Sequence, residues 1–168
     1  SYALVEYELP NARLMLLSRN EKEFKEKIAA RGIKNYGIKY VSMDELQDEL
    51  HQYKYGFILR DNHIVNRVAT PTKMNSYLSN YLIPIFSNTV DDFNRHIELG
   101  EFTIKAQYPL DARSIAKQII DFENVSNDFS KYKSYVDRIF ESHYNDEIIY
   151  RRSPKSCGRI GYWSDDEW

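Results

Sequence analysis

The chain has 168 residues, which is the length of one domain of ordinary size. Its 23 lysines and arginines nearly balance its 25 aspartates and glutamates, and the formal charge of −2 argues against a general binder of nucleic acid or of anionic membranes. The single cysteine excludes an internal disulfide framework and any zinc site built on cysteines.

No stretch of the sequence reaches the roughly 18 consecutive apolar residues of a membrane-spanning helix, and no basic-then-apolar start indicates a signal peptide. Together with the single cysteine, this pattern predicts a cytoplasmic protein. A small basic cluster near the end of the chain, Arg151, Arg152 and Lys155, leaves open a peripheral contact with anionic lipid at the inner face of the cell membrane.

Short apolar runs alternate with helical patterns along the sequence. Strands are expected at 13–18, 38–41, 55–59, 83–86 and 102–105, and helices at 20–31, 42–51, 70–81, 89–99, 111–122 and 126–143. This alternation predicts an α/β fold, a Rossmann-like parallel sheet with helices on both faces. We expect a Rossmann-like domain over 1–125, entered partway through its first strand–helix unit, and a C-terminal helix and tail over 126–168 that pack on it or extend from it.

Several helix starts are indicated by capping residues. Asn20 with Glu23 and Ser42 with Glu45 have the spacing of capping boxes, and Thr89 is expected to cap the helix that follows it. No regular element is expected after residue 145, where the periodicity is lost.

The segment 60–73 is the most informative about chemistry. In an open α/β sheet, ligands bind beyond the carboxyl ends of the strands, and this segment follows an expected strand at that edge. It carries Arg60, Arg67 and Lys73, and it enters a helix whose first N–H groups add positive partial charge. The pattern predicts an anion site suited to a diphosphate. The alternative is a solvated loop in which Lys73 points away from any ligand.

The same region carries a longer motif, which reads G-F-I-L-R at 56–60, N-R-V-A-T-P-T-K at 66–73, Y-L at 77–78 and P-I at 84–85. These residues resemble the donor-binding half of GT-B-fold, retaining glycosyltransferases of bacterial capsular polysaccharide synthesis (group 1 type). The close match covers residues 55–86, and the order of the upstream elements fits the same domain.

This resemblance implies a sugar-nucleotide site. Arg60 and Lys73 would be the catalytic groups that clamp the donor diphosphate, which gains charge as it leaves. The donor-binding residues that the resemblance implies are Val41, Ser42, Asn66, Arg67, Thr72 and Ser76. Of these, the loop at Val41 and Ser42 would flank the base, and Asn66 would contact the sugar or a phosphate.

The resemblance also implies what the chain works with. The partner is a nucleoside-diphosphate-sugar donor, used as substrate, with no cofactor, no metal and no nucleic acid. The four histidines likewise show no metal-ligand spacing. A polysaccharide or lipid-linked acceptor would be held by a preceding acceptor-binding domain that these 168 residues do not include. The 168-residue chain alone is therefore expected to be inactive in transfer.

Two residues depart from the family pattern. Ser76 stands where the family has a glutamate that binds the ribose hydroxyls, and Tyr81 stands where the family has a glycine, which permits close backbone approach. An alternative interpretation is therefore a degenerate, non-catalytic Rossmann-like interaction module. A different nucleotide-binding protein, such as an epimerase-type sugar enzyme, is disfavoured because the sequence has no G-x-G-x-x-G fingerprint.

Overall fold

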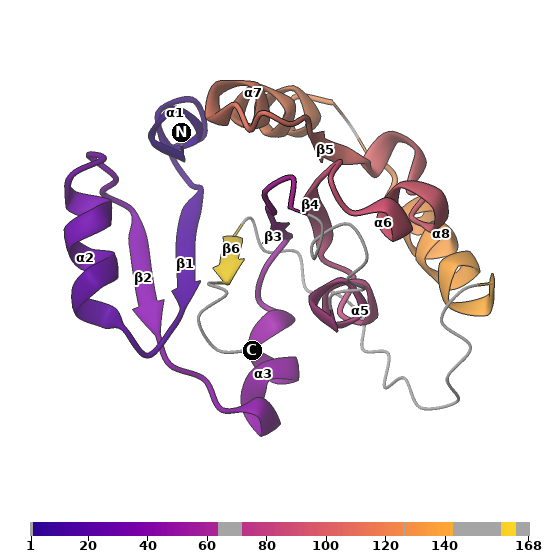
Figure 1. The fold of residues 1–168 in the computed structure, drawn as a ribbon, viewed down its shortest axis with the longest axis horizontal. Helices are drawn as coiled ribbons and strands as arrows, with labels where there is room; N and C mark the ends of the chain where they lie inside the picture. The colour runs from indigo at the N-terminus through magenta and orange to yellow at the C-terminus, as the bar shows by residue number, and fades with distance from the viewer. Residues whose placement is uncertain (1, 64–71, 126, 143–158, 164–168) are drawn as a thin grey trace.

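The computed structural model describes residues 2–63, 72–125, 127–142 and 159–163 (Figure 1). In chain order the elements are α1 (Tyr2–Glu8), β1 (Arg13–Leu17), α2 (Glu21–Ala29), β2 (Tyr36–Lys39), α3 (Met43–Leu50), β3 (Tyr55–Ile58), α5 (Thr72–Ser79), β4 (Ile83–Ser87), α6 (Asp91–His96), the 3₁₀ turn η1 (Gly100–Phe102), β5 (Ile104–Ala106), α7 (Ala112–Glu123), α8 (Phe129–Ser142) and β6 (Arg159–Trp163).

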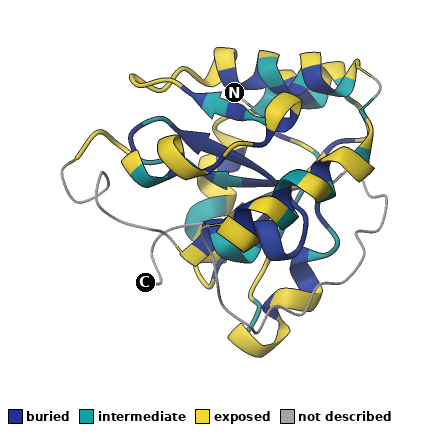
Figure 2. Ribbon diagram, turned by 90° about the vertical axis from the view of Figure 1, so that its right-hand side faces the viewer, coloured by how far each residue is buried: buried dark blue, intermediate teal, exposed yellow. Residues whose placement is uncertain are grey.

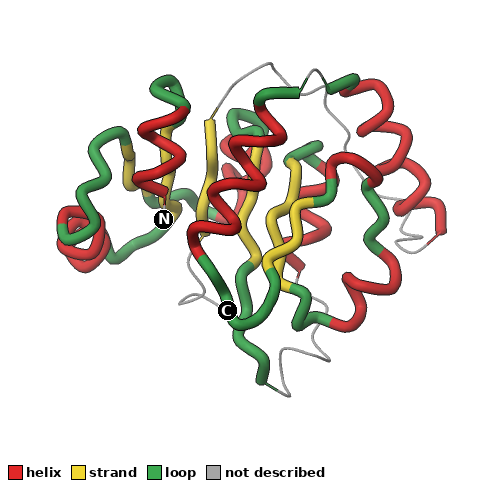
Figure 3. The backbone as a smooth tube through the Cα atoms, turned by 90° about the horizontal axis from the view of Figure 1, so that it is seen from above, coloured by secondary structure: helices red, strands yellow, loops and turns green. Residues whose placement is uncertain are grey.

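The strands form a parallel sheet in the order β2-β1-β6-β3-β4-β5. Helices flank the strands on either side, as the view from above shows (Figure 3). The fold is therefore mixed α/β and is compatible with a Rossmann-like arrangement, as the alternation of elements predicts. The strands expected from 13, 55 and 83 are confirmed, because short apolar runs suit strands that are covered on both faces.

One strand was not expected. β6 lies between β1 and β3, and it pairs Met15 with Gly161 on one side and Gly56 with Gly161 on the other. No pairing joins β1 directly to β3 in the described part of the chain, so β6 connects the β2–β1 pair to the β3–β4–β5 group. Its five residues, R-I-G-Y-W, are too short and too mixed to give a periodic signal.

The expected helix starts are partly confirmed. Ser42 donates its backbone N–H and its hydroxyl to the Glu45 carboxylate, and the capping box is present. At α2, however, Asn20 makes no side-chain cap; its amide donates to the Glu23 carboxylate at 2.5 Å. The cap predicted at Thr89 is wrong, because α6 begins after Val90 and the Thr89 hydroxyl is used elsewhere.

The main apolar core involves the sheet and the helices α3, α5, α7 and α8, and Figure 2 shows buried residues in the strands and on the helices. In its C-terminal part the Phe102 ring is fully buried, with the rings of Phe122, Phe129, Tyr132 and Tyr135 at centroid distances of 5.0–6.5 Å. α8 therefore packs on the domain, one of the two arrangements expected for the residues after 125.

A buried hydrogen bond ties α8 to this core. The Tyr132 hydroxyl donates to the backbone carbonyl of Leu82, and burial raises the pKa of Tyr132 well above its ordinary value. Tyr132→Phe is expected to lower the free energy of unfolding by about 1–2 kcal/mol, because the Leu82 carbonyl loses its buried donor. Chemical denaturation measures this loss.

The matched control for this substitution is Tyr135→Phe on the same helix. The Tyr135 hydroxyl donates to Glu101 at 3.3 Å in an exposed contact, so its removal should change stability by less than ~0.5 kcal/mol. Equal losses in the two variants would contradict a special contribution of the buried bond.

Candidate functional site

The carboxyl ends of the parallel strands meet at one edge of the sheet. Val41 and Ser42 follow β2, Arg60 follows β3, and Ser87 ends β4. α5 connects β3 to β4, so its first turn, with Thr72 and Lys73, begins at the same edge. The topology thus brings Arg60 and the start of α5 together. Of the other predicted residues, Ser76 lies farther along α5, and those at 66 and 67 lie outside the described part of the chain.

The backbone of Arg60 is held in place by two buried hydroxyl groups. Its N–H donates to the Ser87 hydroxyl at 2.9 Å, and its carbonyl accepts from the Thr89 hydroxyl at 3.1 Å. The two hydroxyls are themselves hydrogen-bonded at 2.9 Å. The Arg60 side chain is half-buried and leaves the sheet from this anchored point. Ser87 and Thr89 thus hold the backbone of Arg60. Thr89 has this role in place of the helix cap that was predicted for it.

Lys73 is buried, with 3% of its surface exposed, in the first turn of α5. The Lys73 side chain is therefore not solvated, whereas most of the loop in that alternative interpretation lies outside the described residues. Burying an ammonium group is costly unless polar groups or anions surround it. The first turn also carries the positive end of the helix dipole. Two cationic residues thus border one connection: Arg60 follows β3, and Lys73 is in the first turn of α5.

The loop after β2 shares this edge but lies farther away. Two strands, β1 and β6, separate β2 from β3, so three strand spacings place the loop on the order of 14 Å from β3. The Ser42 hydroxyl donates to Glu45 at 2.7 Å, and this bond, with that of the Ser42 N–H, holds the pKa of Glu45 below its usual range. Its donor is thus used to start α3.

Between the loop and β3, Arg19 and Tyr40 form a second polar pair at the edge. The Arg19 guanidinium lies 4.5 Å from the centroid of the Tyr40 ring and donates to the Tyr40 hydroxyl at 2.5 Å. These residues follow β1 and β2. The contact between Arg19 and Tyr40 could not be predicted, because nothing local in the sequence shows that β1 and β2 are neighbouring strands.

The structure describes both residues that depart from the family pattern. Ser76 is half-buried in α5, and its carbonyl accepts from the Asn80 amide at 2.8 Å; nothing in the structure explains the serine. Tyr81 has a φ of 56°, the left-handed conformation that glycine usually supplies just after a helix. A glycine would suit the backbone at this position.

The described residues show neither a metal-binding cluster nor a membrane-spanning helix. Among the described residues, no group of three or more histidine, cysteine, aspartate or glutamate side chains is arranged to hold a metal ion. Within the same residues, no helix combines the length and the apolarity needed to span a membrane.

Comparisons with protein-family models, with curated proteins and with solved structures found no match. The class that the structure shows is a mixed α/β protein with a parallel sheet, in which Arg60 follows β3 and Lys73 lies in the first turn of α5.

Proposed function

We propose that the chain is the donor-binding part of a GT-B-type glycosyltransferase and that its β3–α5 edge binds the diphosphate of a nucleotide sugar. The observation that carries the proposal is the burial of Lys73 in the first turn of α5, at the edge where Arg60 leaves β3. An arginine fork, an ammonium group and the N–H groups of a helix start suit a diphosphate better than any uncharged ligand.

The chemistry of transfer gives these groups a role. As the glycosidic bond to the donor phosphate breaks, negative charge grows on the departing nucleoside diphosphate, and fixed cations stabilise it. Arg60 is suited to this because Ser87 and Thr89 fix its backbone before any ligand arrives. Lys73 is suited to it because burial strengthens its interaction with a charge.

The remaining contacts follow from the layout of the edge. A nucleoside extending from the β3–α5 connection toward β2 would reach the Val41–Ser42 loop, with Ser76 near the ribose. The acceptor would be a growing polysaccharide or a lipid-linked glycan at the inner face of the cell membrane. It would be held by a further, acceptor-binding domain, so the 168 residues alone should bind the donor without transferring the sugar.

Nucleotide binding tests the proposal. Isothermal titration with UDP, GDP and their sugar conjugates is expected to give saturable binding with dissociation constants from about 10 µM to 1 mM, because two cations and helix N–H groups contact one diphosphate. Arg60→Ala and Lys73→Met should each weaken binding at least ~10-fold, which corresponds to the loss of one charge-assisted contact.

Lys117→Ala is the matched control, since it removes one exposed cation from the surface of α7. It should leave the affinity unchanged, and circular dichroism should confirm that all three variants are folded. A folded wild-type chain that binds none of these nucleotides would contradict the donor site and would favour the interaction module instead.

A further inference from the structure

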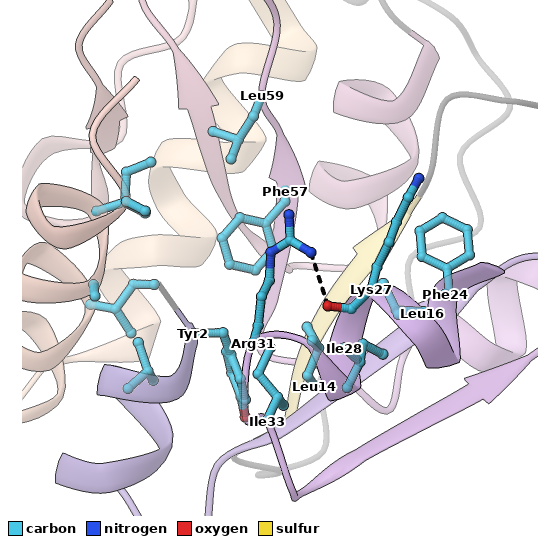
Figure 4. A pocket seen from close by; sticks show the side chains of 15 residues that line it. Tyr2, Leu14, Leu16, Phe24, Lys27, Ile28, Arg31, Ile33, Phe57 and Leu59 are labelled. Carbon is cyan, nitrogen blue, oxygen red and sulfur yellow. Dashed lines mark hydrogen bonds between the residues drawn. The ribbon is translucent and has the colours of Figure 1, made fainter. Parts of the chain in front are cut away.

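An apolar groove runs along the face of the sheet opposite α3 and α5. Its volume is about 440 Å³, and Figure 4 shows the side chains that line it. Its floor includes alternating residues of two strands: Leu14 and Leu16 of β1, and Phe57 of β3 with Leu59 just after it. Its walls come from α1, α2 and α7, with Phe24 and Ile28 on one side and Ile115 and Ile119 on the other, and Arg31 lines it just after α2.

The groove borders two clusters of apolar residues. Leu14, Leu16, Ile28 and Ile33 form a small cluster under α2, Ile115 and Ile119 of α7 belong to the main core, and Tyr2 packs against both. An apolar element seated between α2 and α7 would contact both clusters.

The strand connections identify the shape of that element. α2 connects β1 to its parallel neighbour β2, and α1 leads into β1 on the same face of the sheet. Crossover helices of this kind run antiparallel to the strands and lie side by side at about 10 Å. Tyr2 is the first residue of α1 and lines the groove. The groove therefore continues from the first turn of α1 into the space between α2 and α7. Among the described residues, no group forms a hydrogen bond with the buried Tyr2 hydroxyl.

The charges on the rim identify the chemistry. Of the described residues that line the groove, only Lys27 and Arg31 are charged, and both lie on the α2 side. Lys27 pairs with Glu23, and Arg31 donates to the Lys27 carbonyl at 2.9 Å (Figure 4). Among the described residues, Arg31 forms no ion pair. A complementary occupant therefore presents carboxylates toward α2.

We propose that this groove is the docking site of an amphipathic α-helix that runs antiparallel to the strands, with an apolar face toward β1 and β3 and a glutamate- or aspartate-bearing flank toward Arg31. A helix in a groove recognised through an apolar face is a common mode of protein recognition. The groove lies on a helix-covered face of the sheet and reaches the carboxyl edge at Leu59, and the lining residues include neither Arg60 nor Lys73.

A pair of synthetic peptides tests this. One is a helix of about four turns with leucines at i, i+3, i+4 and i+7 and glutamates along one flank, and the other has lysines in place of the glutamates. Fluorescence anisotropy should show saturable binding of the glutamate peptide and at least ~10-fold weaker binding of the lysine peptide, because the rim is positive. Arg31→Ala should reduce this preference.

Two tryptophan variants locate the binding. Ala112→Trp places a large ring in the groove from the exposed start of α7 and should weaken binding at least ~10-fold. Ala30→Trp, at an exposed position that does not line the groove, should leave it unchanged. No saturable binding of the glutamate peptide, equal binding of both peptides, or self-association of the chain that Ala112→Trp abolishes would each overturn the proposal. Arg60→Ala should leave peptide binding intact, which separates this result from the nucleotide test.

Discussion

Phe102→Ala is expected to lower the free energy of unfolding by about 3–5 kcal/mol, the range for removing a fully buried aromatic ring. Phe102 has no exposed surface. Its ring contacts four other aromatic rings, one from α7 and three from α8. The surrounding rings cannot close the space without losing their edge-to-face contacts, so much of the cavity would persist.

Urea denaturation with a two-state fit measures this effect. Tyr7→Ala is the matched control, because it removes an aromatic ring that is 80% exposed on α1, and it should change stability by less than ~0.5 kcal/mol. A loss below ~1 kcal/mol for Phe102→Ala would mean that Phe102 is not in the packed core.

Gly56→Ala is expected to cost about 2–4 kcal/mol, because overpacking a rigid site forces neighbouring side chains and backbone to shift. A Cβ at this position would lie 2.4–2.6 Å from three atoms of the Tyr77 ring. Tyr77 cannot easily yield, since it is fully buried and its hydroxyl donates to the Phe57 carbonyl at 3.3 Å. Gly56 is also in the middle of the sheet, paired with Pro84 and Gly161.

A double-mutant cycle with Tyr77→Ala checks the cause. In that background the added methyl group should cost less than ~1 kcal/mol, because its obstacle is gone. Gly37→Ala is a second comparison: there the Cβ would meet the flexible end of Met15, which can move aside at a smaller cost. An undiminished cost of Gly56→Ala in the Tyr77→Ala background would show that the strain has another source.

The packing of Gly56 against Tyr77 also bears on the motif that suggested the function. Both residues belong to the pattern, yet in the structure they contact each other inside the fold. Tyr81, at the family glycine, ends α5 in a left-handed conformation. These positions therefore reflect how β3 and α5 pack and end. Among the described residues of the motif, Arg60, Thr72 and Lys73 lie where β3 ends and α5 begins.

The parallel strands and their alternation with helices could be predicted because each apolar run has the length of a buried strand. The carboxyl edge as the place for polar chemistry followed from that alternation. The central place of β6 could not be predicted, because strand order depends on contacts between segments far apart in the chain. The use of Ser87 and Thr89 to anchor Arg60 was equally hidden, since a threonine before a helix has the same local pattern whether it caps the helix or bonds a neighbouring strand.

The burial of Lys73 is the finding that local sequence could predict least. A lysine in a first helical turn usually extends into solvent, and only the three-dimensional arrangement of α5 against β3 and β4 shows otherwise. The candidate site therefore consists of a buried ammonium group, that of Lys73, and an arginine, Arg60, whose backbone is fixed by hydrogen bonds at the carboxyl edge of the sheet.

Amide chemical-shift mapping tests the central claim most directly. A ¹⁵N-labelled chain is titrated with UDP and with GDP, and the perturbed backbone amides are located. The account predicts that the largest perturbations fall at Arg60, at Thr72 and Lys73, and at Ser87 to Thr89, with smaller ones near Ser42. Perturbations confined to the groove between α2 and α7 or to the opposite edge of the sheet, or none for either nucleotide, would contradict it.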